Sequence, residues 1–260
     1  MENNEMEDAA ILGYGVVGKA TAKGFGISRY FDLKGSNCTL QDVSKCKQVF
    51  ICLPTPTVNG ECQVEPIVDL VNQVHSYGST PLFIIRSTVT PGTARRIIQT
   101  TGVPTVVSNP EFLSEDTADY DARHPRIVVI GSDTPGYGDA LQARYEGRWK
   151  GLKIIRTDTV TAETIKYAFN SFFATKVVFA NALYDLCQNS KANYQTIKES
   201  LESHPWGSKN HFDVWHKGGR GAGGRCLSKD MEAFANYSNQ GFFREVNRIN
   251  KLLLAEYPKT

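Results

Sequence analysis

The residue best suited to covalent chemistry is Cys226, in the segment 218–230, which reads GGRGAGGRCLSKD. Glycines allow a backbone to approach a ligand closely and leave N–H groups available to face it. Arg220 and Arg225 are suited to binding an anion such as a phosphate. A thiol in such a setting can act as a nucleophile. The alternative is a flexible surface loop with one buried structural cysteine, and this segment alone slightly favours that alternative.

A second candidate site lies near the start of the chain, where ILGYGVVG contains the pattern GxGxxG between an apolar and a helical stretch. Gly13 permits a tight turn, Gly15 the close approach of a pyrophosphate, and Gly18 the packing of a helix on its strand. Asp32 ends the next predicted strand. Its carboxylate can accept hydrogen bonds from an adenosine ribose and would repel a 2′-phosphate. The pattern predicts an NAD site, ahead of the alternative that the glycines serve only a tight turn.

Three further polar segments each follow a predicted strand. They are LPTPT (53–57), RSTVTPGT (86–93) and SNPEFL (108–113). In parallel sheets, the carboxyl ends of the strands line the ligand crevice. Each segment alone could be a strand end with proline turn chemistry, but three at one sheet edge indicate a binding site.

A pair of polar residues lies on the long predicted helix Asp158–Gln188. Lys166 and Asn170 are four residues apart, so they share one face of that helix. Lys166 has apolar neighbours, and we therefore expect it to be partly buried. The alternative is a surface lysine whose amine reaches solvent.

The elements that position these residues follow a strand–helix alternation over residues 6–130. The apolar runs are Ala9–Leu12, Val49–Leu53, Leu82–Ile85, Thr105–Val107 and Ile127–Ile130. Helical patterns between them are Val16–Phe25, Pro66–Tyr77 and Gly92–Thr101. The alternation predicts an α/β fold with a Rossmann-like, doubly wound, mostly parallel sheet.

The pattern changes after Gly151, and we expect a second, α-helical domain with a long central helix. Asp158–Gln188 carries apolar residues on more than one face, so it must be buried in a helical core or at a dimer interface. Leu227–Tyr237 and Phe243–Tyr257 are predicted as closing helices. The expected division is 1–150 for the NAD-binding domain and 151–260 for the helical domain that carries the cysteine loop.

The composition excludes several classes of protein. An apolar fraction of 41% and a charged fraction of 22% are typical of a soluble globular protein. A net charge of +2 gives no reason to expect nucleic-acid or membrane partners. The acidic start is unlike a secretory signal, and the cysteines and histidines show no metal-ligand spacing. We expect a cytoplasmic protein without a metal site.

The chain resembles the UDP-glucose/GDP-mannose dehydrogenase family in six segments that follow the family's order. They are GYGVVG, LPTPT, STVTPGT, NPEFLSEDTADYDARHPRIVVIG, AETIKYAFNSFFATKVVFAN and GAGGRCLSKD. The resemblance implies oxidation of the C6 hydroxyl of a nucleotide sugar, UDP-glucose or similar, to a uronic acid. The resemblance also implies that two NAD molecules are used and that the reaction passes through a covalent thioester.

The resemblance also implies catalytic roles. Cys226 is similar to the nucleophile that forms a thiohemiacetal and then the thioester. Lys166 and Asn170 match the pair that stabilises oxyanion character at C6. Glu111 and Asp230 match carboxylates that activate water.

Further roles are implied for Thr88 and for two sets of contacts. Thr88 matches a residue that helps to position water. The implied cofactor contacts are Gly13, Gly15, Val16, Val17, Gly18, Asp32, Thr55, Thr88 and Glu115, of which Thr55, Thr88 and Glu115 are expected near the nicotinamide. The implied substrate contacts are Glu111, Phe112, Leu113, Lys166, Asn170, Gly223 and Arg225. A homodimer through the long helix is also implied.

The sequence departs from the family pattern at four places, one of which is a shorter region between Asp32 and Val49. Ala222 replaces an aromatic that packs beside the substrate, and Ser228 replaces a proline. The sequence ends before the family's second Rossmann-like domain, which binds much of the nucleotide. Two alternatives therefore stay open: a two-electron NAD-dependent dehydrogenase acting on a smaller or different substrate, and a non-catalytic NAD-binding module completed by a partner chain.

Overall fold

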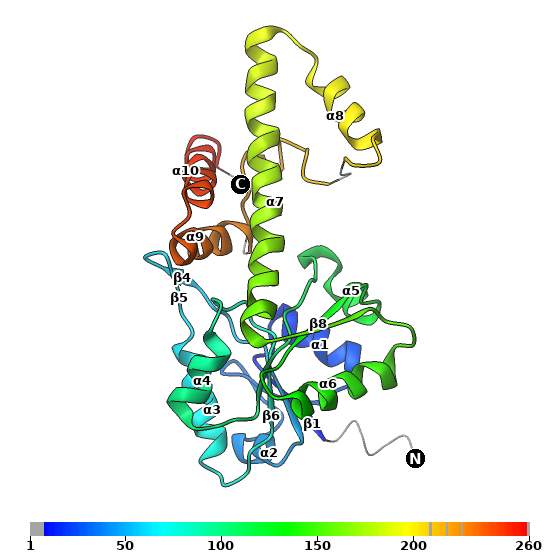
Figure 1. The fold of residues 1–260 in the computed structure, drawn as a ribbon, viewed down its shortest axis with the longest axis vertical. Coiled ribbons are helices and arrows are strands. Elements are labelled where there is room, and N and C mark those ends of the chain that lie inside the picture. Colours follow the sequence, from blue (N-terminus) through cyan, green and yellow to red (C-terminus); the bar gives the residue numbers. More distant parts are fainter. Residues whose placement is uncertain (1–7, 208–209, 217, 225, 259–260) are drawn as a thin grey trace. The chain divides into compact units, whose positions relative to one another are not determined.

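The computed structural model describes residues 8–207, 210–216, 218–224 and 226–258. The chain forms two compact units, and Figure 1 labels many of their helices and strands. The first unit comprises Cys62–Lys166 together with the chain up to Pro56. The second comprises the chain from Tyr167 onward together with Thr57–Glu61. The boundary between them falls within one long helix.

The first unit is built on a seven-stranded sheet in the order β2-β1-β3-β6-β7-β8-β9. The strands are β1 (Ala9–Leu12), β2 (Arg29–Phe31), β3 (Gln48–Ile51), β6 (Leu82–Ile85), β7 (Val106–Ser108), β8 (Val128–Gly131) and β9 (Ile154–Thr157). Neighbouring strands are parallel except β7 and β8, which are antiparallel. The predicted mostly parallel sheet is therefore confirmed.

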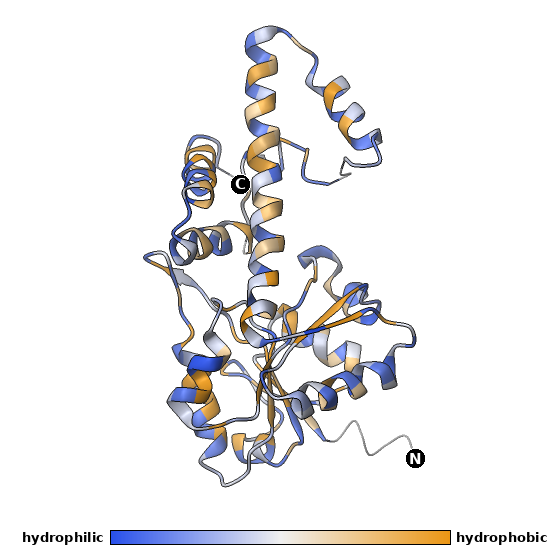
Figure 2. Ribbon diagram, in the orientation of Figure 1, coloured by the Kyte–Doolittle hydropathy of each residue, from blue (hydrophilic) through white to orange (hydrophobic). Residues whose placement is uncertain are grey.

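Helices cover both faces of this sheet. The helices of the first unit are α1 (Val16–Phe25), α2 (Leu40–Ser44), α3 (Glu65–His75), α4 (Thr93–Thr101), the 3₁₀ helix η1 (Glu115–Thr117), α5 (Ala118–Arg123) and α6 (Pro135–Arg148). Ala10 and Leu12 share one apolar cluster with α2, α3 and α4, whereas Ala9 and Ile11 share another with α1 and α6. Alternate residues of one strand thus face opposite cores. Figure 2 shows the apolar colouring along these strands, as expected for a doubly wound sheet buried on both faces.

The second unit is mainly helical, as the sequence predicts. Its elements are α7 (Thr159–Ser190) from Tyr167 onward, α8 (Tyr194–Ser203), α9 (Leu227–Ser238) and α10 (Gly241–Glu256). A short hairpin, β4 (Thr57–Val58) and β5 (Glu61–Cys62), starts in this unit. Its core joins Ala174 and Val178 of α7 to Met231 of α9 and Val246 of α10. The long central helix is confirmed within two residues at each end.

The elements that have no counterpart in the sequence analysis include helix α6 and strand β9 of the first unit. Helix α6 begins with Pro135-Gly136, which is easily read as a turn, although proline is favoured at the first helical position. Strand β9 lies at the edge of the sheet and is only partly buried, so its apolar pattern is weak. No helix in the described part of the chain has the length and hydropathy to cross a bilayer.

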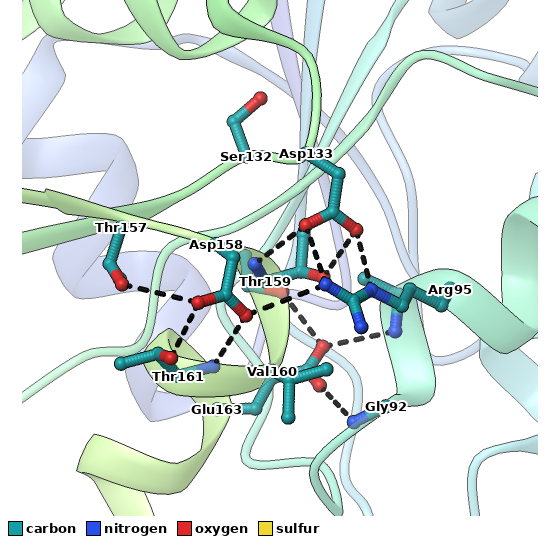
Figure 3. Close-up of polar contacts among 12 residues, drawn as sticks. Gly92, Arg95, Ser132, Asp133, Thr157, Asp158, Thr159, Val160, Thr161 and Glu163 are labelled. Atoms are coloured by element: carbon teal, nitrogen blue, oxygen red, sulfur yellow. Dashed lines mark hydrogen bonds and ion pairs between the residues drawn. The ribbon is translucent and has the colours of Figure 1, made fainter.

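The start of α7 is held by a partly exposed ionic cluster (Figure 3). Asp133 accepts hydrogen bonds from the N–H and Oγ1 of Thr159 at 3.2 and 2.9 Å. Arg95 donates to the two Asp133 oxygens from Nε at 2.8 Å and from Nη2 at 3.1 Å. Hydrogen bonds from Arg95, then from Thr159, lower the pKa of Asp133 to about 2, and burial opposes them.

Replacing Asp133 by Asn should lower the free energy of unfolding at pH 7 by about 1 kcal/mol, because water screens this partly exposed pair. The folded-state pKa lies below the ordinary value of 3.8, so the contribution is complete above pH 4. It is lost as the pH falls from about 4 to 2. Denaturant unfolding of both proteins across this range measures the difference. Asp139→Asn, at another surface ion pair, is the control and should change stability by less than about 0.5 kcal/mol. A constant difference from pH 7 down to pH 2 would contradict this explanation.

Candidate active site

The turn between β1 and α1 has the geometry of a dinucleotide cradle. Gly13 has φ +89°, and a Cβ there would lie 2.7 Å from the carbonyl oxygen of Cys52. A Cβ on Gly18 would lie 1.9 Å from the carbonyl oxygen of Gly13, so only glycine lets the helix approach this closely. Apart from Gly15 and its chain neighbours, no atom lies within 4 Å of where a Cβ on Gly15 would be. This space leaves room for a pyrophosphate at the helix N-terminus. These glycines fit NAD.

Asp32 lies at the end of β2, next to this turn. Its Oδ2 accepts a hydrogen bond from the N–H of Tyr14 at 2.7 Å, and its Oδ1 accepts one from the N–H of Lys34 at 2.9 Å. The backbone N–H groups of Lys34 and Tyr14 lower the pKa of Asp32 below its ordinary value. The carboxylate is therefore ionised at neutral pH, as a ribose acceptor that repels a 2′-phosphate must be.

Replacing Asp32 by Asn removes the negative charge and keeps one acceptor oxygen. We expect the Kd for NAD to rise about tenfold and the preference for NAD over NADP to fall by about two orders of magnitude. Calorimetric titration with each nucleotide measures both quantities. Asp69→Asn, on the exposed side of α3, is the matched control. An unchanged ratio of the two affinities would show that Asp32 does not select the cofactor.

The three polar segments meet at one edge of the sheet, because β3, β6 and β7 are adjacent and parallel. The Oγ1 of Thr55 donates to the carbonyl oxygen of Thr88 at 2.6 Å, which joins the first segment to the second. The Nη1 of Arg86 donates to the Oδ1 of Asn109 at 2.6 Å, which joins the second to the third. The predicted clustering of these strand ends is confirmed, and Thr55 and Thr88 are brought into contact.

Glu111 and Lys166 form a buried ion pair in the first unit. Lys166 Nζ lies 3.0 Å from Glu111 Oε1, and the side chains are only 7% and 9% exposed. The other carboxylate oxygen of Glu111 accepts the N–H of Leu113 at 2.7 Å. Lys166 Nζ also lies 5.7 Å from the ring centre of Phe112. The expected burial of Lys166 is confirmed, and burial of both charges is tolerated because each has a partner.

Asn170, Asp230 and Cys226 lie in the second unit. Asp230 is buried, and its Oδ2 accepts a hydrogen bond from Asn170 Nδ2 at 2.6 Å. Lys229 forms an ion pair with the same carboxylate. Cys226 is exposed and occupies the N-cap position of α9, where its carbonyl oxygen accepts the N–H of Asp230 at 3.0 Å. A helix N-terminus carries partial positive charge, which favours a thiolate over a thiol.

The loop that precedes Cys226 is anchored by a residue that the sequence analysis missed. The amide of Asn250, on α10, accepts the N–H of Ala222 at 2.6 Å and donates to its carbonyl oxygen at 3.0 Å. Asn250 is fully buried, and Ala222 is buried in the apolar cluster of this unit. The sequence signal that could have identified Asn250 is a single amide side chain on the otherwise apolar side of α10. Ala222, which stands where the family pattern has an aromatic residue, thus lies in a packed part of the loop.

The anion-binding role predicted for Arg220 is wrong. Arg220 is buried, and its guanidinium donates to Asn181 Oδ1 and to Asp185 Oδ1, both at 2.7 Å. It also lies 4.7 Å from the ring centre of Tyr257. These contacts make Arg220 an internal anchor of the second unit. The glycine-rich sequence gave no sign of the partners, because they come from α7 and from the end of α10.

The other residues predicted to contact the cofactor or the substrate are mostly exposed or half-buried. Val16 is exposed and Val17 half-buried at the start of α1, and Glu115 is exposed at the start of η1. Gly223 is half-buried, and Arg225 lies outside the described residues. Among the described residues, no group of three or more histidine, cysteine or acidic side chains could hold a metal ion.

Comparison with known proteins agrees with this arrangement. Residues 27–148 match the NAD-binding domain of the UDP-glucose/GDP-mannose dehydrogenase family, and residues 160–251 match the family's central domain. The chain belongs to this family, and its cofactor is NAD. A UDP-glucose 6-dehydrogenase of Rickettsia conorii is 33% identical over 210 residues, which cover 78% of this chain and 48% of the relative.

Two further similarities indicate the breadth of the family. A GDP-mannose 6-dehydrogenase of Pseudomonas savastanoi is 29% identical over 236 residues, or 85% of this chain and 53% of the relative. The solved structure of a UDP-glucose dehydrogenase from the archaeon Pyrobaculum islandicum shares the fold, with a TM-score of 0.82 and 22% identity. The match covers 97% of this chain and 69% of that one. The chain thus spans about half the length of the curated relatives that it matches.

Proposed function

We propose that the protein oxidises the C6 hydroxyl of a nucleotide sugar, UDP-glucose or a close analogue, to the uronic acid in an NAD-dependent reaction. The observation that supports this most strongly is the pairing of predicted catalytic residues. Glu111 pairs with Lys166 in the first unit, and Asn170 pairs with Asp230 beside Cys226 in the second. Burying these charged and amide groups costs free energy unless each has a partner, and here the partners are residues to which the resemblance assigns catalytic roles.

In the proposed mechanism, NAD held at the Gly13–Gly18 turn would supply the hydride acceptor for two oxidations at C6, the first of which also releases the hydroxyl proton to water. After the first oxidation, the Cys226 thiolate adds to the C6 aldehyde carbon, and the resulting alkoxide takes up a proton to give a thiohemiacetal. Removal of a second hydride and of that proton leaves the thioester. Lys166 and Asn170 stabilise negative charge on the C6 oxygen. Thr88 holds a water molecule, from which Glu111 or Asp230 accepts a proton. Hydrolysis of the thioester by this water restores the thiol.

Two alternatives are consistent with the residues. The protein could catalyse a single two-electron oxidation of a smaller or different substrate, or it could bind NAD without turnover as part of an assembly with another chain. Purified protein should be mixed with NAD and a panel of UDP- and GDP-sugars while absorbance of the reduced cofactor is followed. Reduction with one of these sugars is expected. NAD binding without reduction on any sugar would favour the binding module.

We further propose that the protein is a cytoplasmic homodimer that associates through α7. Phe172, Phe179 and Leu186 of this helix are each more than half exposed, an apolar surface that association would bury. Light scattering at micromolar concentration should give twice the monomer mass. A monomer at that concentration would exclude this proposal.

A further inference from the structure

Glu163 is a buried carboxylate in α7, one turn before Lys166, and only 3% of it is exposed. It accepts hydrogen bonds from three consecutive backbone N–H groups at the start of α4. The donors are Gly92 at 2.6 Å, Thr93 at 3.1 Å and Ala94 at 3.0 Å. Figure 3 shows Glu163 directed toward this helix start. A carboxylate from α7 therefore caps the helix that follows the Thr88 segment.

A fourth hydrogen bond extends the connection to β7. Ser108 Oγ donates to Glu163 Oε1 at 2.8 Å. Ser108 is the last residue of β7 and lies three positions before Glu111, the partner of Lys166. Glu163 thus ties together three segments: the one that carries Thr88, the one that carries Glu111, and the helix turn that carries Lys166.

A small cavity of about 10 Å³ lies at the junction of these segments. Its lining includes Thr88, Ser108, Glu163 and Lys166. Side chains that are packed around so small a space constrain one another's positions. Lys166 therefore borders the same packed space as the carboxylate that holds α4.

Holding the Glu163 carboxylate in a buried position costs free energy. Burial raises the pKa of Glu163 to about 7, although hydrogen bonds from Ser108, Ala94, Gly92 and Thr93 oppose the rise. At the start of α7, Asp133 serves as a partly exposed cap, which avoids this cost. A surface acceptor of that kind is enough to bind the unpaired N–H groups at the start of a helix. A buried carboxylate three residues from Lys166 indicates a role beyond capping.

We propose that Glu163 is a positioning residue, which fixes Lys166 against Glu111 and the Thr88 segment for the oxidation at C6. The inference rests on the proposed function. Glu163 acts through the backbone of α4 and through Ser108, without contact to the reacting atoms. The ionised form, which predominates above a pKa of about 7, is the form that matters. Neither a protonated carboxyl nor an amide can accept from all four donors while its own O–H or NH₂ group faces N–H groups.

The test compares Glu163→Gln with Glu146→Gln, a substitution of an exposed glutamate on α6. In Glu163→Gln, kcat should fall about 30- to 100-fold, since small displacements of catalytic groups have effects of this size. The Kd for NAD should stay within about twofold, because Glu163 makes its hydrogen bonds to α4 and Ser108 and none to the Gly13–Asp32 cradle. The KM for the sugar should rise with the displacement of Lys166, which is an expected substrate contact. Glu146→Gln should match the wild type in all three quantities.

A second readout does not depend on turnover. In protein labelled with ¹³C-lysine, the Cε signal of Lys166 is identified by its loss in Lys166→Met. We expect this signal to shift in Glu163→Gln and to stay in place in Glu146→Gln. If Glu163→Gln does not fold, Glu163→Asp replaces it. The shorter carboxylate keeps the charge but cannot reach α4 and Ser108 together, so the Lys166 signal should still shift and kcat should fall about tenfold.

The inference is overturned if the Lys166 signal keeps its wild-type position, whatever happens to kcat. It is also overturned if the signal shifts but kcat stays within twofold of the wild type. If the wild-type protein turns over no sugar, the proposed function fails by itself. The Lys166 signal then decides whether Glu163 positions this amine.

Discussion

Replacing Cys226 by Ser is expected to reduce uronic acid formation by at least three orders of magnitude. A serine hydroxyl at a helix N-terminus remains protonated near neutral pH, so it cannot replace the thiolate that adds to the C6 aldehyde. Binding of NAD should be unchanged, because the Gly13–Gly18 turn and Asp32 belong to a different unit. Chromatographic detection of the uronate over time measures the loss.

Cys38→Ser is the matched control for this experiment. Cys38 lies in the first unit, half-buried, and its thiol donates to the carbonyl oxygen of Tyr30. A serine hydroxyl can make the same hydrogen bond, so the variant should keep its activity. If Cys226→Ser formed uronic acid at the wild-type rate, a covalent role for this cysteine would be excluded.

Replacing Lys166 by Met should produce two separate losses. Removing the cation leaves the carboxylate of Glu111 buried without its partner, which should destabilise the fold by about 3 kcal/mol. It also removes a donor to the C6 oxygen, which should lower kcat by about 10²–10³-fold. Denaturant unfolding and steady-state kinetics measure the two effects, and Lys150→Met, at an exposed lysine, controls for the loss of a positive charge.

A double variant separates stability from catalysis. In Lys166→Met with Glu111→Gln, no unpaired charge remains, so most of the lost stability should return. Activity should stay low, because the double variant has neither the cation of Lys166 nor the carboxylate of Glu111. Recovery of kcat together with stability would show that the Glu111–Lys166 pair is structural.

Local sequence was sufficient to predict the sheet and much of the candidate site. The GxGxxG turn and the run of apolar strands are local patterns, and parallel topology then brings their carboxyl ends to one edge. The contact between Thr55 and Thr88 follows from that topology. The burial of Lys166 was predictable from its apolar neighbours on α7.

The features that the sequence did not reveal depend on contacts between distant segments. Glu163 reads as an ordinary helical glutamate until its four donors, from α4 and β7, are seen. Arg220 resembles a ligand-binding arginine in a glycine loop, yet its partners Asn181 and Asp185 lie more than thirty residues earlier. Asn250 has the same character, since its partner Ala222 is on another segment. Side-chain pairing of this kind has no local period in the sequence.

The central claim is a four-electron oxidation that passes through Cys226. The most direct test is the ratio of reduced NAD formed to nucleotide sugar consumed by the purified chain. The proposed mechanism predicts two equivalents of reduced cofactor for each uronate, with no accumulation of aldehyde. One equivalent, with an aldehyde or ketone as the final product, would contradict it.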